Sequence, residues 1–85
     1  MRVNKVLVKL YVPMLEESYE IFIPINKRIS NIIDLLVKSI NETGNGMYNM
    51  NKMPLLYNKS TAKRYNINLT VKENNIKNGT ELILI

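Results

Sequence analysis

The chain has 85 residues and a mass of 9.9 kDa, which is the size of a single folded domain spanning residues 1–85. Hydrophobic residues make up 46% and charged residues 22% of it, a globular composition that excludes intrinsic disorder. The absence of cysteine and histidine excludes disulfides, thiolate metal sites and the commonest general base. A net charge of +5 favours an anionic partner without choosing between nucleic acid, lipid and acidic protein.

The N-terminal apolar run is interrupted at Lys9, before it reaches the length of a signal-peptide core. No apolar run approaches the roughly 20 residues of a membrane-spanning helix. We therefore expect a cytoplasmic protein that does not insert into a membrane.

A β-hairpin is predicted at the N-terminus. Apolar residues alternate with polar ones over residues 6–12, and the alternation resumes over 18–25 after a break at 13–17. This period of two is typical of strands with one buried face. The side chains expected on the core face are Val6, Val8, Leu10, Val12, Tyr19, Ile21, Ile23 and Ile25.

A helix follows over residues 31–43, where apolar residues recur at helical spacing. Ser30 is the expected N-cap, and Gly44 is expected to end the helix in a left-handed conformation. Beyond it, Met47, Met50 and Met53 predict a loop with one helical turn that either packs against the helix end or offers an adaptable binding surface. Short strands are predicted at 55–57, 67–71 and 80–85.

This order of elements predicts an α+β fold, a β-grasp in which a mixed sheet of four to five strands carries one helix across one face. The string from Thr70 to Leu82 reads Thr-apolar-x-x-x-x-Ile-x-x-Gly-Thr-x-Leu and resembles the ubiquitin superfamily. The resemblance implies that Ile76 fills the core and that Gly79 makes the tight turn into the last strand.

Within that superfamily, the size of the chain, its Ile-rich helix and the closing segment 76–82 most resemble the bacterial YukD/EsaB group. The resemblance implies a small cytosolic accessory of type VII secretion. Ubiquitin-type modifiers and sulfur carriers need a flexible Gly-Gly tail, whereas this sequence ends in a predicted strand, Leu82-Ile83-Leu84-Ile85. We therefore expect no covalent conjugation, unless a natural tail has been removed.

No catalytic constellation emerges from the sequence, so we expect neither an enzyme nor a cofactor. Glu16 and Glu17 are adjacent on a predicted loop, whereas paired-carboxylate catalysis needs opposed groups in a cleft. Asp34 is the sole aspartate, without calcium-loop spacing. Gly44-Asn45-Gly46 lacks the Lys-Ser/Thr that completes a phosphate loop.

Two surfaces are candidates for binding. If the core face is assigned as above, Leu7, Phe22, Ile83 and Ile85 lie on the open face of the sheet, with Leu56 beside them. An apolar patch of this kind, with Lys5, Lys9 and Glu20 at its rim, predicts a protein-interaction surface. The alternatives are scattered surface residues and a homodimer through the same face.

The second candidate surface is basic. Lys59, Lys63 and Arg64, with Tyr57 and Tyr65 nearby, form a cluster that could follow a phosphate backbone. Nucleic-acid binding is therefore the alternative to protein binding, and its affinity is expected to fall steeply with salt.

Overall fold

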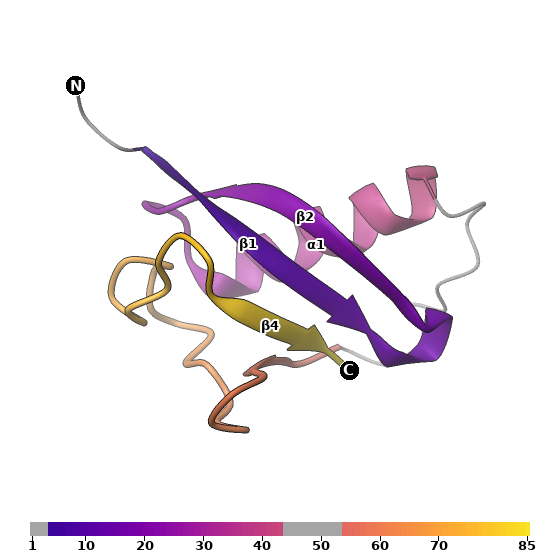
Figure 1. The fold of residues 1–85 in the computed structure, drawn as a ribbon. Helices are drawn as coiled ribbons and strands as arrows, with labels where there is room; N and C mark the ends of the chain where they lie inside the picture. The colour runs from indigo at the N-terminus through magenta and orange to yellow at the C-terminus, as the bar shows by residue number, and fades with distance from the viewer. Residues whose placement is uncertain (1–3, 44–53) are drawn as a thin grey trace.

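The computed structural model describes residues 4–43 and 54–85 (Figure 1). In chain order it contains β1 (Lys5–Val12), a 3₁₀ turn η1 (Pro13–Leu15), β2 (Glu17–Pro24), α1 (Ile29–Thr43), β3 (Leu56–Asn58) and β4 (Glu81–Leu84). The predicted helix stop at Gly44 and the methionine loop lie outside the described residues. No helix in the described ranges has the length and apolar character to span a membrane.

The strands form one 4-stranded sheet in the order β2-β1-β4-β3. β1 pairs antiparallel with β2 and parallel with β4, and β3 pairs antiparallel with β4. The helix α1 lies across one face of this sheet (Figure 1). The predicted α+β architecture, a mixed sheet with one helix, is confirmed.

The N-terminal hairpin also follows the prediction. Leu7 is opposite Phe22, and Lys9 is opposite Glu20, so every second side chain of both strands faces the helix. The connecting turn is closed by the Glu16 amide, which donates to the Pro13 carbonyl over 3.1 Å, with Glu16 itself in the left-handed conformation at φ 51°.

The core lies between the sheet and α1. Both layers contribute aliphatic side chains that are almost completely removed from water, as their alternation in the strands and their helical spacing in α1 predict. The largest of them are Leu10, Ile29, Ile32, Leu36, Ile40, Leu56, Leu82 and Leu84. Tyr19, Ile21 and Ile25 of the hairpin pack against this core but are only partly buried.

The start of the helix differs from the prediction. α1 begins at Ile29, so Ser30 lies inside its first turn and is not the N-cap. The first amides need no side-chain cap, because backbone carbonyls from another loop accept from them. The Ile29 amide donates to the Leu69 carbonyl at 2.9 Å, and the Ser30 amide donates to the Ile67 carbonyl at 3.1 Å.

The predicted strand at 67–71 is wrong. Apart from an isolated bridge between Thr70 and Arg28, this segment is built of turns. The Thr70 amide donates to the Glu73 carboxylate at 3.0 Å, and the Glu73 amide donates to the Thr70 hydroxyl at 3.1 Å, which is a reciprocal capping box. The hydrogen bond from the Thr70 backbone amide to the carboxylate, followed by a smaller contribution from the Thr70 side chain, holds the pKa of Glu73 below its usual value.

The two residues singled out by the resemblance lie as expected. Ile76 is 3% exposed and belongs to the core. Gly79 has φ +87°, a conformation that favours glycine, and its amide donates to the Leu7 carbonyl over 2.8 Å. The turn at Gly79 therefore delivers the chain into β4 beside β1.

Candidate protein-interaction surface

The face of the sheet opposite α1 carries apolar side chains on all of its strands. In β1 the even-numbered residues are buried against the helix, so Leu7, Lys9 and Tyr11 point to the open face. From β2 the open face receives Phe22, which is 64% exposed. Ile83 of β4 lies on the same side, and so does Ile85, which follows the last residue of β4. Ile85 is also 64% exposed.

One row of side chains crosses this face near the carboxyl ends of β1 and β4. Tyr11 is in register with Ile83, and Ile83 is in register with Tyr57 on the next strand. Directly opposed side chains on one face of a sheet contact each other. The Lys59 ammonium lies 5.4 Å from the centre of the Tyr11 ring, within the range of a cation–π interaction. The row is therefore apolar at its centre and positively charged at one edge.

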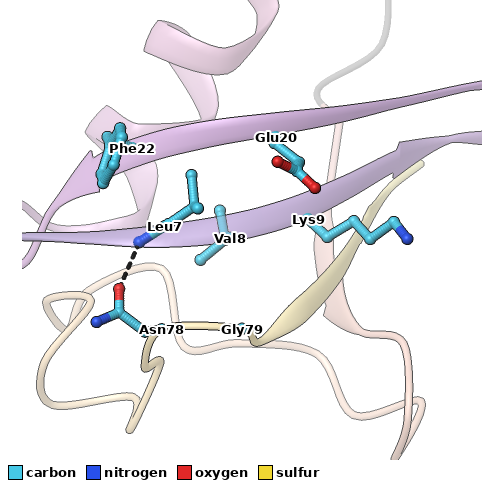
Figure 2. A pocket seen from close by; sticks show the side chains of 7 residues that line it. All are labelled: Leu7, Val8, Lys9, Glu20, Phe22, Asn78 and Gly79. Atoms are coloured by element: carbon cyan, nitrogen blue, oxygen red, sulfur yellow. Dashed lines mark hydrogen bonds between the residues drawn. The ribbon is translucent and has the colours of Figure 1, made fainter.

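The other end of the face contains a hollow of about 400 Å³. Leu7 and Phe22 supply its apolar wall, Lys9 and Glu20 lie on one side, and Asn78 and Gly79 on the other (Figure 2). Asn78 is held in place because its side-chain carbonyl accepts from the Leu7 amide over 2.7 Å. The hollow thus combines an apolar floor with an opposed pair of charges.

The placement of Leu56 on this surface is wrong. Leu56 is 1% exposed and belongs to the core, opposite the equally buried Leu84. The strand pattern at 55–57 was too short to fix which residues face the helix, and an error of one residue reverses every side chain. Its neighbour Tyr57 occupies the open face instead.

Of the predicted apolar set, Leu7, Phe22, Ile83 and Ile85 do share the open face. The prediction omitted Tyr11 and Tyr57. Tyr11 could have been found, because it alternates with the buried residues of β1 in the same way as Leu7. Tyr57 could not, since its side depends on the pairing between β3 and β4, which the local sequence does not specify.

The basic cluster lies beside β3. Lys59, Lys63 and Arg64 are all exposed, but Tyr65 is 9% exposed and packs in the core, so its ring is not free to stack on a base. The Asn58 side-chain amide donates to the Tyr65 hydroxyl at 2.9 Å. Burial raises the pKa of Tyr65, and the hydrogen bond from Asn58 partly offsets this.

The described residues offer no group of three or more acidic, histidine or cysteine side chains that could hold a metal ion. Glu16 and Glu17 are exposed on the hairpin turn, and Asp34 lies on the exposed side of α1. What the geometry provides is a partly exposed apolar face with charged residues at its rim, an arrangement suited to binding.

Comparison of the whole fold with solved structures identifies its type. The ubiquitin-like domain of EccD5 from Mycobacterium xenopi superposes with a TM-score of 0.81 at 17% sequence identity, covering 98% of this chain and 94% of that one. The chain has the ubiquitin-like fold. The sheet face described above is therefore the helix-free face of a ubiquitin-like domain.

Other solved structures share this fold. The ubiquitin-like domain of the Mycobacterium tuberculosis type VII secretion protein ECCD1 superposes with a TM-score of 0.75 at 11% identity, covering 98% of this chain and 99% of that one. A chain of the MycP5-free ESX-5 inner membrane complex gives 0.78 at 16% identity, covering 98% of this chain but 21% of that one. No protein-family model and no curated protein sequence matches the chain.

Proposed function

We propose that this ubiquitin-like domain is a non-covalent protein-interaction module, not an enzyme, and that it serves as a small cytosolic accessory of a larger bacterial machine such as type VII secretion. It binds its partner through the open face of the sheet, defined by Leu7, Tyr11, Phe22, Tyr57, Ile83 and Ile85.

The observation that carries this proposal is the exposure of large apolar side chains on one sheet face. Phe22 and Ile85 each expose 64% of their surface, although the opposite face of the same sheet is buried by α1. Burying apolar surface of this kind stabilises a complex by roughly 25 cal/mol per Å² before the costs of association are subtracted. The cations at the rim, Lys9 and Lys59, would speed encounter with an acidic partner.

The link to secretion is supported by the solved structures that share the fold. Two of them are ubiquitin-like domains of EccD proteins, one of which is named as a type VII secretion system protein, and a third is a chain of the ESX-5 inner membrane complex. In that third case the present domain corresponds to 21% of the longer chain. A ubiquitin-like domain can therefore be part of such a machine, and this supports the same setting for the present chain.

The test is affinity capture from native lysate with mass spectrometry, using the wild type and two matched variants. Ile85→Glu places a charge on the open face. Leu35→Glu places the same charge on the outer side of α1, where Leu35 is 48% exposed. We expect the wild type and Leu35→Glu to recover the same partner and Ile85→Glu to lose it.

Equal recovery of the partner by all three proteins would overturn the role of the open face. Recovery of nucleic acid at low salt, equally by all three and lost as salt rises, would instead assign function to Lys59, Lys63 and Arg64. Circular dichroism of both variants establishes that they remain folded.

A further inference from the structure

The outer edge of β2 presents unpaired backbone groups. The Lys9 amide donates to the Thr80 carbonyl, and the Leu7 carbonyl accepts from the Gly79 amide, so the odd-numbered residues of β1 bond toward β4. The even-numbered residues of β1 must then bond to β2, in agreement with the bond from the Ile25 amide to the Asn4 carbonyl. It follows from the antiparallel pattern that Ser18, Glu20 and Phe22 point their amides away from the sheet.

The opposite edge of the sheet is closed by the chain itself. The Leu56 carbonyl accepts from the Tyr65 amide at 3.0 Å, and Asn58 exchanges backbone bonds with Lys63 at 2.9 Å and Ala62 at 2.8 Å. At the β2 edge, no carbonyl within residues 4–43 or 54–85 accepts from the three outward amides. An open strand of 8 residues is a template for pairing with another chain.

The side chains of β2 are partly exposed on both faces of the sheet, so an added strand could pack against them on either face. On the helix side, Tyr19 and Ile21 face the core but remain partly exposed, because the sheet ends at β2. On the open side, Glu20 and Phe22 border the hollow shown in Figure 2. A strand beside β2 would therefore meet apolar surface on the helix side, and the Glu20 carboxylate beside the exposed Phe22 ring on the other.

The charge of this edge selects the chemistry of the partner. Glu17 and Glu20 lie on β2 and Glu16 lies in the turn before it, and no lysine or arginine occurs between Lys9 and Lys27. Lys9 of β1 is opposite Glu20 on its inner side, so these three carboxylates face one nearby cation, although the whole chain carries a net charge of +5. A second copy of this chain is disfavoured, because pairing β2 with itself brings the Glu20 carboxylates close together and like charges across strands repel.

We propose that β2 binds an extended segment of a partner protein as an additional strand of the sheet, and that this segment alternates apolar residues with lysine or arginine. The apolar residues pack on Tyr19 and Ile21, and the basic residues face Glu20. Backbone hydrogen bonds to Ser18, Glu20 and Phe22 supply affinity, and the alternation supplies specificity. This edge is separate from the row formed by Tyr11, Ile83 and Tyr57, although Phe22 borders both the edge and the open face, and the proposal does not depend on the function proposed above.

The probe is a blocked seven-residue peptide of alternating lysine and valine, titrated into the ¹⁵N-labelled full chain. We expect slower hydrogen exchange and shifted resonances at the amides of Ser18, Glu20 and Phe22. The matched control peptide carries glutamate in place of every lysine, and we expect it to bind at least about tenfold more weakly, since charged pairs at close range add to strand pairing.

Two variants separate the backbone from the charge. Glu20→Pro removes one outward amide without removing a bond to β1, whereas Glu20→Gln removes the charge and keeps the amide. We expect Glu20→Pro to raise the dissociation constant about fivefold or more and Glu20→Gln to raise it about threefold. Ile85→Glu is the control, because Ile85 lies away from the β2 edge, and we expect this variant to leave the dissociation constant for the peptide unchanged.

If saturating peptide leaves hydrogen exchange at the amides of Ser18, Glu20 and Phe22 of the wild type unchanged, the proposal is overturned without reliance on any variant. Equal binding of both peptides would overturn its charge complementarity. Concentration-dependent dimerisation that Glu20→Pro abolishes, measured by sedimentation equilibrium, would make a second copy the occupant and overturn the proposed partner.

Discussion

The two edges of the sheet differ in whether their outer backbone groups are hydrogen-bonded. β3 contains 3 residues, yet the chain returns at residues 62–65 to bond its outer side. β2 contains 8 residues and has no such cover in the described structure. The difference teaches that the length of a strand does not decide whether its edge is open; what decides is whether the following loop folds back on it.

The largest expected effect concerns the residues that anchor the closed edge. Replacing the buried Leu56 by alanine is expected to lower the free energy of unfolding by about 2–5 kcal/mol, since it leaves a cavity between sheet and helix. Its neighbour Tyr57 points to the open face, and Tyr57→Ala is expected to cost about 1 kcal/mol or less. Urea denaturation of both variants measures the difference; similar losses would contradict the assignment of faces.

This pair of neighbours also shows what the sequence could and could not predict. The hairpin was predictable because alternation over two long strands fixes both faces at once. Ile76 and Gly79 were predictable from the motif that contains them. Leu56 was misplaced because three consecutive apolar residues do not show by themselves which side chains face the core. The orientation of Leu56 depends on the pairing of β3 with β4.

The turn at 67–71 shows a second kind of error. Ile67, Leu69 and Val71 alternate like a strand, but Val71 is fully buried while Ile67 and Leu69 are 36% and 37% exposed. The spacing of Thr70 and Glu73 is the sequence signal that predicts a capped turn there. Ser30 failed as a cap for a different reason, because the carbonyls that replace it come from a segment distant in sequence.

Opening the closed edge is the second test of the comparison. The Asn58 side-chain oxygen accepts from the Ser60 amide at 2.8 Å and the Thr61 amide at 3.0 Å, and the Asn58 side-chain nitrogen donates to the Tyr65 hydroxyl. Asn58→Ala is expected to cost about 1–2 kcal/mol and to speed hydrogen exchange at the Tyr65 amide. Asn31→Ala, on the exposed side of α1, is the control; equal exchange in both variants would contradict the role of Asn58.

The smallest expected effect is a pH dependence of stability caused by Tyr65, whose amide bonds to the closed edge at β3. Burial raises the pKa of Tyr65 above its unfolded value, so the neutral phenol is favoured in the fold. The stabilisation is fully present below the unfolded pKa of about 10 and is lost as pH rises through the folded pKa. Tyr65→Phe is expected to cost roughly 1 kcal/mol at neutral pH.

Above pH 10 the difference in unfolding free energy between wild type and Tyr65→Phe is expected to narrow, because only the wild type pays to keep its phenol neutral. Thermal unfolding followed by circular dichroism from pH 8 to pH 11 measures this. A difference that stays constant over that range would show that Tyr65 ionises equally well in the folded and unfolded chain.

The hydrogen bond from the Leu7 amide to Asn78 joins residues separated by 71 positions. The hairpin can form within microseconds because its contacts are local, whereas the parallel pairing of β1 with β4 must close a loop of almost the whole chain. We therefore expect the hairpin to form before the inner side of β1 is paired with β4. We expect closure by the last strand to be the slow step of assembly, and the chain to be most prone to association with other unfolded chains before that step.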